Sequence, residues 1–179
     1  MLVYETALEC AINEDLRSEW TTYHLQTQNH VAALIGVCES FGLDAGEVTP
    51  GCQIVQHIGK ALVTAMKMAL AEGNAAAAEL VACECVVLAE TKDHADWELL
   101  GECAQALEGE AASVLTAAVE QIEDEEDAHL YHTKEWCREL WLKSLGLEAV
   151  LPPPEDTENV KSAVGAEKAK KERTAQTAR

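Results

Sequence analysis

The chain has 179 residues, of which 48% are hydrophobic and 4% aromatic, and its formal net charge is −19. This length suffices for one domain with its own core, and the abundance of Ala, Leu, Glu and Val favours helices over sheets. An acidic surface repels phosphate, so we expect no nucleic-acid partner. No apolar run approaches the roughly 20 residues of a membrane span, and the start lacks a basic leader, so we expect a cytoplasmic protein without a membrane partner.

The charge is unevenly distributed along the chain. Residues 159–179 contain six Lys/Arg and two Glu, whereas the preceding part carries seven Lys/Arg and 30 Asp/Glu, a net charge of −23. Three prolines at 152–154 end the apolar pattern, and the residues after them are small, charged and poor in apolar side chains. We therefore predict a helical domain over residues 1–150, followed by a proline-rich strap and a disordered basic tail over 151–179.

The seven cysteines are an odd number and form no C-x-x-C pair. Most of them lie among alanines and valines, where a thiol behaves as a small apolar side chain. We therefore expect neither a disulfide framework nor a zinc–thiolate site.

Apolar residues spaced alternately four and three apart predict helices over most of the domain. The predicted helices cover residues 2–12, 13–41, 50–71, 75–107 and 110–145. Thr49 followed by Pro50 is a strong signal for a helix start, and Gly42 and Gly146 are signals for helix ends. The helix over 50–71 carries on one side the residues Ile54, Ile58, Ala61, Leu62, Ala65 and Ala69.

The lengths of the links between these helices predict how they are arranged. The links near residues 13–14 and 108–110 are short and make antiparallel hairpins, whereas the connection over 42–73 is long. Two helical hairpins joined by a long crossover is a standard layout of four-helix bundles. We predict an all-α four-helix bundle with an additional helix in the crossover.

Residues of metal-ligand type interrupt the apolar stripes of three helices. The interruptions are His30, the pair Glu90 and His94, and the pair Glu126 and His129. The last pair has the spacing E-x-x-H, which places both side chains on one helix face. A buried carboxylate without a partner costs several kcal/mol unless a cation compensates it. Carboxylates and imidazoles together suit iron or manganese better than zinc.

The residues around these interruptions complete the predicted site. Glu5 lies on the stripe of the first helix, with Glu9 as a substitute. Near Glu126, three acids are expected to point sideways or outward, namely Asp124, Glu125 and Asp127. The histidines off the main stripes are expected at the surface or outside the ligand set, namely His24, His57 and His132.

A purely structural interpretation also accounts for these residues. In it, each histidine is a satisfied core residue, and Glu90 and Glu126 pair with Lys92, with Lys134 or with the histidines themselves. The metal hypothesis rests on coincidence, because similar residue types interrupt separate helices of one bundle.

Two segments carry a resemblance to a known family. "HLQTQNHVAALIGVCESFGL" (residues 24–43) and "VEQIEDEEDAHLYHTKEW" (residues 119–136) make the chain similar to the ferritin-like superfamily, which includes bacterioferritins, rubrerythrins and a stress-associated branch. The resemblance covers roughly residues 1–147. It implies a di-iron or di-manganese centre, with one Glu from each of two helices and Glu-x-x-His from each of the other two.

The resemblance also assigns ligands position by position. Glu126 and His129 match the pair of the last helix, and Glu90 matches the lone Glu of the third. His30 matches the histidine of the second helix, and Glu5 is the candidate from the first.

Two positions depart from the family pattern. Thr27 stands where a Glu is expected three residues before His30, and the first helix is short. The centre would then hold one metal, bind weakly or need a helix from a neighbouring subunit. His94 would replace a lost ligand.

The sequence thus predicts a ferritin-like protein that binds iron or manganese in its core. With open coordination positions, a ferroxidase activity linked to oxidative stress would follow. The alternative is a non-enzymatic bundle with a degenerate metal site, acting through oligomerisation or partner binding. In both cases we expect a homodimer or a larger homo-oligomer.

Overall fold

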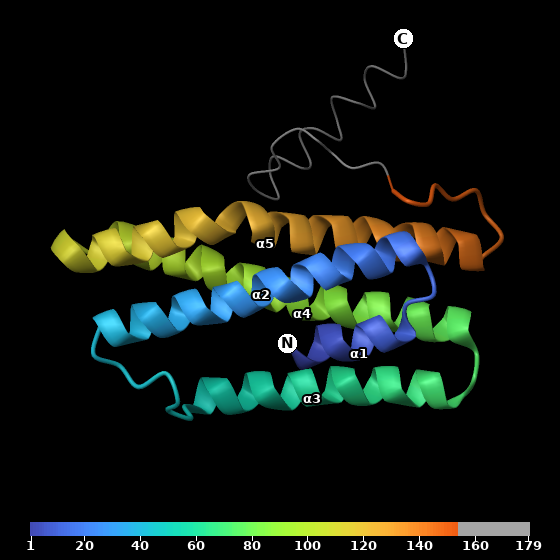
Figure 1. Ribbon diagram of the computed structural model, residues 1–179, viewed down its shortest axis with the longest axis horizontal. Helices are drawn as coiled ribbons and strands as arrows, with labels where there is room; N and C mark the ends of the chain where they lie inside the picture. The colour runs from blue at the N-terminus through green and yellow to red at the C-terminus, as the bar shows by residue number, and fades with distance from the viewer. Residues whose placement is uncertain (154–179) are drawn as a thin grey trace, which may run out of the picture.

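The computed structural model describes residues 1–153 (Figure 1). Its helices are α1 (Leu2–Cys10), α2 (Glu14–Ser40), α3 (Pro50–Ala71), α4 (Ala75–Ala106) and α5 (Gly109–Ser144). The described residues contain no strand, so the all-α prediction is confirmed. The helix boundaries lie within two residues of those predicted from the sequence.

Capping side chains explain where the helices begin. The side chains of Asn13, Thr49 and Asn74 each accept a hydrogen bond from a backbone N–H in the first turn of α2, α3 and α4, respectively. These bonds satisfy donors that have no partner inside the helix. The residues Gly42, Gly73 and Gly146, which follow helix ends, have positive φ angles.

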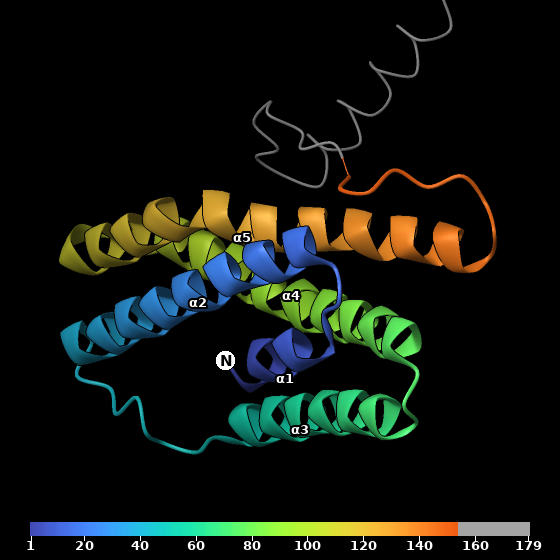
Figure 2. The same ribbon diagram turned by 45° about the vertical axis from the view of Figure 1, so that its right-hand side comes forward.

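The helices α1, α2, α5 and α4 pack in a closed ring (Figures 1 and 2). In this ring α1 contacts α2 and α4, and α5 contacts the same two helices from the opposite side. Helix α3 lies outside the ring against α1 and α4. Because α1 has nine residues and α2 has 27, α1 accompanies α2 over only part of its length.

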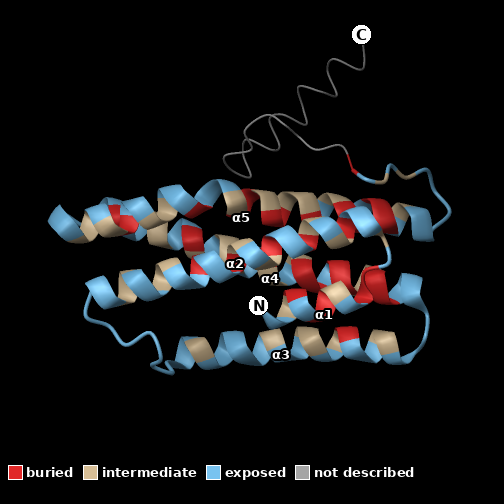
Figure 3. Cartoon of the chain, viewed as in Figure 1, coloured by how far each residue is buried: buried red, intermediate tan, exposed pale blue. Residues whose placement is uncertain are grey.

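The core includes side chains of the short helix α1 and of the helices that pack around it. The largest fully buried side chains include Trp20, Trp136, Tyr4 and Leu16, which belong to α1, α2 and α5 (Figure 3). Burial of each of these large side chains contributes roughly 2–3 kcal/mol to folding, so this core supplies much of the stability of the fold.

The predicted apolar side of α3 is only partly buried. Ile54 and Ile58 are 62% and 48% exposed, whereas Met66 is fully buried. The apolar side predicted for this helix is therefore exposed at Ile54 and Ile58. An apolar stripe is buried only where another element lies against it, and α2 and α3 do not contact each other.

Two glycines give opposite predictions for stability. Gly101 lies inside α4, and a Cβ added there would meet Val119 Cγ1 at 3.7 Å, an ordinary contact. Gly101→Ala is therefore expected to raise the free energy of unfolding by about 0.5–1 kcal/mol. Gly146 has φ +72°, so Gly146→Ala is expected to lower it by about 1 kcal/mol. Urea unfolding followed by circular dichroism measures both, and a destabilised Gly101→Ala would contradict the packing described.

The segment after α5 returns along that helix. The backbone N–H of Val150 donates to Glu139 Oε2 at 2.9 Å, and Leu151 packs against the core. This hydrogen bond lowers the pKa of the Glu139 carboxyl, with a further contribution from Arg138. Only the first three residues of the predicted strap are described; the predicted disordered tail lies outside the described residues.

Two further sequence expectations can be compared with the structure. All seven cysteines are free thiols, as expected. Within residues 1–153, no helix is both long enough and apolar enough to cross a membrane.

Candidate metal centre

Four of the predicted ligands lie close together between helices α2, α4 and α5. His30 comes from α2, Glu90 from α4, and Glu126 and His129 from α5. All four are buried, and Glu126 and His129 are only 1% and 0% exposed. Each occupies a position on its helix stripe that a leucine would otherwise fill, which is why the spacing of apolar residues revealed them.

His30 and Glu126 are in close contact, and they form an ion pair when the imidazole is protonated. His30 Nδ1 and Glu126 Oε1 are 2.7 Å apart, yet neither atom has a hydrogen-bond partner by geometry. His129 Nδ1 lies 3.8 Å from the same oxygen, also without a partner. One ligand atom from each of these three residues fits within 4.8 Å of the others. Two imidazole nitrogens and one carboxylate oxygen, all buried, thus surround one small space.

Hydrogen bonds on the outer side of each imidazole determine which nitrogen faces inward. His30 Nε2 lies 2.7 Å from Glu125 Oε2, and His129 Nε2 lies 2.9 Å from Gln26 Oε1. Both partners accept, so each Nε2 carries a proton and each Nδ1 faces the shared space, where it offers a lone pair to a metal when the imidazole is neutral. Metal-binding histidines are usually oriented in this way by an outer acceptor.

A second cluster adjoins the first and consists only of carboxylates. Oxygens of Glu90, Asp93 and Glu126 lie within 4.8 Å of one another. Glu126 belongs to both clusters, and neither of its oxygens has a hydrogen-bond partner. Burial and the charges of Glu126 and Glu90 raise the pKa of Asp93 to about 7. The arrangement offers one mixed nitrogen–oxygen position and one all-oxygen position for a cation.

Asp93→Asn provides a test of this crowding of carboxylates. A carboxyl whose pKa is raised on folding destabilises the fold as pH rises through that pKa, whereas an amide does not. At pH 8 the metal-free Asp93→Asn variant is therefore expected to be more stable than the parent by roughly 1 kcal/mol or more. The gain should vanish near pH 4. Thermal unfolding in the presence of chelator at both pH values measures it, and a destabilised variant at pH 8 would contradict the cluster.

Two predicted ligands, Glu5 and His94, are not brought into these clusters. The Glu5 side chain is 48% exposed and lies 3.6 Å from His24. His94 Nε2 lies 2.7 Å from Asp127 Oδ1, apart from the space between His30 and His129.

The inward residue of α1 is Tyr4 rather than Glu5. Its ring centroid lies 6.2 Å from that of His129. Burial first, and then the charge of Glu90, raises the pKa of Tyr4 well above its ordinary value, so the phenol stays protonated. Tyr4 therefore closes the α1 side of the centre as a neutral group. Glu9, the substitute considered for Glu5, is exposed.

The orientation predicted for the acids beside Glu126 was wrong for Asp127, which is buried and contacts His94 of α4. Glu125 points sideways, as predicted: its side chain is half-exposed and contacts His30 of α2. The reason is that α5 packs between α2 and α4, so its inward face is wider than one stripe. Asp124 is exposed, as predicted.

The histidines placed outside the ligand set differ in their surroundings. His57 is exposed. His132 Nδ1 lies 2.9 Å from the hydroxyl of Tyr23, whose ring centroid is 4.3 Å from that of His129. His132 therefore contacts Tyr23, a residue beside the centre, and belongs to neither ligand cluster.

The lysines do not neutralise the buried acids. Lys92 pairs with Asp96, and Lys134 lies 5.5 Å from the ring centroid of Tyr131. The structural interpretation was therefore wrong in pairing Glu90 and Glu126 with these lysines. Its other form, in which the acids pair with the histidines themselves, agrees with the contacts of Glu126 with His30 and of Glu90 with His129. The nearest cationic groups to Glu126 are the imidazoles of His30 and His129, when protonated.

Comparison with models of protein families, with curated proteins and with solved structures finds no match to this chain.

Proposed function

We propose that this chain is a ferritin-like metal-binding protein whose helix ring holds iron or manganese. The observation that carries the proposal is the set of buried ligand atoms around Glu126 that make no hydrogen bond of good geometry: His30 Nδ1, His129 Nδ1, Glu90 Oε2 and both oxygens of Glu126. The polar groups beside them are one another, as in the 2.7 Å contact of His30 Nδ1 with Glu126 Oε1 and the 3.6 Å contact of His129 Nδ1 with Glu90 Oε2. A buried polar atom without a hydrogen bond is unfavourable by about 1–3 kcal/mol, and more when it is charged. Coordination of one or two divalent cations would satisfy these atoms.

The arrangement of helices supports the ferritin-like part of the proposal. The ring order α1, α2, α5, α4 joins two antiparallel hairpins, and α3 lies in the long connection between them. Ferritin-like carboxylate proteins use this connectivity and place their ligands on the inward faces of facing helices. Here those faces supply His30, Glu90, Glu126 and His129.

The donor set supports the choice of metal. Three carboxylates and two imidazoles exceed the four ligands of a structural zinc site, and the described chain brings no thiol into either cluster. Oxygen-rich sites with some imidazole suit ferrous iron and manganese. A redox-active iron with open positions would supply oxidation of Fe²⁺ by O₂ or peroxide. The chain's own residues would hold the ion, orient the imidazoles through Gln26 and Glu125, and exclude bulk water.

The proposal is tested by adding Mn²⁺ and recording its electron paramagnetic resonance signal, which weakens when the ion leaves water for a protein site. We expect one or two tightly bound ions per chain. The double variant His30→Ala/His129→Ala should lose them, whereas His57→Ala, which removes an exposed histidine, should bind like the parent. Equal binding by the parent and the double variant would overturn the proposal.

The exposed apolar residues of α3 favour a second candidate function, assembly of copies of the chain. Ile54 and Ile58 add to other exposed apolar residues such as Val55 and Phe41. Such a surface is typical of a protein interface. Size-exclusion mass with and without chelator tests whether assembly occurs and whether it needs metal. A monomer under both conditions would overturn this candidate and leave the metal proposal intact.

A further inference from the structure

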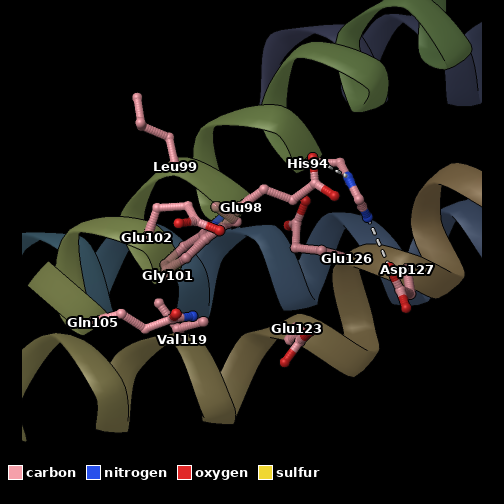
Figure 4. A pocket seen from close by; sticks show the side chains of 11 residues that line it. His94, Glu98, Leu99, Gly101, Glu102, Gln105, Val119, Glu123, Glu126 and Asp127 are labelled. Atoms are coloured by element: carbon pink, nitrogen blue, oxygen red, sulfur yellow. Dashed lines mark hydrogen bonds and ion pairs between the residues drawn. The ribbon is translucent and has the colours of Figure 1, made fainter. Parts of the chain in front are cut away.

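A pocket of about 460 Å³ lies between α4 and α5, beside the candidate metal centre (Figure 4). Glu98 and Glu102 from α4 lie on one side of it, and Glu123, Glu126 and Asp127 from α5 lie on the other. The lining therefore contains five carboxylates, and it includes neither Lys nor Arg.

The inner end of this pocket is Glu126. Its side chain is 1% exposed, and neither carboxylate oxygen has a hydrogen-bond partner. The same side chain belongs to both ligand clusters. The pocket thus leads directly to the residue at which the two candidate metal positions meet.

The pocket wall carries a second buried oxygen without a partner. Asp127 Oδ1 contacts His94 Nε2, but Asp127 Oδ2 has no partner although the Asp127 side chain is only 5% exposed. Asp127 directly follows Glu126 in the chain, and both residues line the pocket, so a cation passing along this wall would meet Asp127 next to Glu126.

The outer residues of the pocket are exposed acids. Glu98, Glu102 and Glu123 are all exposed. A cleft lined by charges of one sign concentrates counter-ions and raises their association rate. Six water molecules occupy roughly 180 Å³ at their volume in the liquid, so the pocket has room for a hydrated divalent ion. An anionic ligand would be repelled by the same walls.

We propose that this pocket is the port through which hydrated divalent cations reach the candidate metal centre. The proposal rests on the metal-binding function proposed above and adds the route, the acids that attract the ion and the wall residue Asp127. In this scheme Glu98, Glu102 and Glu123 attract the ion, Asp127 contacts it as it loses water, and Glu126 receives it.

The test compares association rates of Mn²⁺ in two variants with the same change in net charge. The port variant is Glu98→Gln/Glu102→Gln/Glu123→Gln. The control, Asp15→Asn/Glu72→Gln/Glu148→Gln, removes three exposed acids that lie at the start of α2, just after α3 and just after α5, and none of them lines the pocket. Stopped-flow mixing at low ionic strength should show the association rate constant falling about tenfold in the port variant and less than twofold in the control. The difference should shrink at high salt, because exposed charges are screened.

The outcomes separate the port from the metal site. Asp127→Asn, which keeps an oxygen for His94, should also slow association while leaving the number of bound ions unchanged. Equal rate constants in the port variant and the control, with binding intact, would overturn the port and leave the metal site standing. A parent chain that binds no Mn²⁺ would overturn both.

Discussion

Replacing Glu126 with alanine is expected to lower the affinity for Mn²⁺ or Fe²⁺ more than about 100-fold. Loss of a residue that merely orients a ligand typically weakens metal binding 10–100-fold, and Glu126 lies in both ligand clusters. Its removal deprives His30 and His129 of their shared carboxylate neighbour and leaves the all-oxygen cluster with two members. Equilibrium dialysis with either ion measures the change.

Two further variants make this prediction specific. Glu126→Gln preserves the size of the side chain but removes its charge, so it should lose most of the affinity without a cavity in the core. Glu120→Ala removes an exposed acid from the same helix and should bind like the parent. An affinity within a few-fold of the parent in both Glu126 variants would show that this residue is not a ligand.

Acidification from pH 7 to pH 5 is expected to weaken metal binding at least about 100-fold. Histidine ligates metal only when neutral, and free imidazole has a pKa near 6.5. Two imidazoles must each release a proton, so affinity falls by up to about 100-fold per pH unit once both are protonated. Burial lowers the pKa of His30, but the carboxylates of Glu126 and Glu125 more than offset this and raise it overall. Because the pKa of His30 is raised, loss of metal should begin at a higher pH than it would with an unperturbed imidazole.

Glu125→Gln is the matched variant for the pH dependence. It removes one of the two charges that raise the pKa of His30 while keeping an oxygen that can accept from His30 Nε2. The pH at which half of the metal is released should move to lower pH. An affinity that does not change between pH 7 and pH 5 would exclude imidazole ligands.

The interrupted stripes predicted the four residues at the centre of the site but not Asp93 beside them. His30, Glu90, Glu126 and His129 were identified because each replaces an apolar residue on a stripe, and burial follows from the stripe itself. Asp93 follows Glu90 by three residues, whereas the predicted stripe continued four residues on, through His94, and whether Asp93 or His94 joins the cluster depends on how far α4 is rotated toward α5. A single sequence does not determine that rotation.

Helix α1 shows why short helices are harder to interpret. With nine residues it spans between two and three turns, so a stripe through Glu5 and one through Tyr4 fit the sequence almost equally. The structure places Tyr4 inward and Glu5 outward. A shift of one residue, or about 100° of rotation, decides whether this helix supplies a carboxylate or a phenol.

The departure at Thr27 has a local explanation in the structure. Thr27 is buried, and its hydroxyl donates to the backbone carbonyl of Tyr23 at 2.9 Å, so the position carries no free ligand. Its neighbour Gln26 instead accepts from His129 Nε2. Helix α2 thus supplies one imidazole and one orienting amide, where the family pattern has a Glu-x-x-His pair. The sequence indicated the missing ligand, but the role of Gln26 depended on the packing of α2 against α5.

The most direct test of the central claim is anomalous scattering at the iron edge from crystals soaked anaerobically in ferrous salt. We expect a peak bounded by His30 Nδ1, His129 Nδ1 and Glu126, with a second position toward Glu90 and Asp93. Peaks confined to exposed acids, with His30 and Glu126 still in contact and no ion between them and His129, would contradict it.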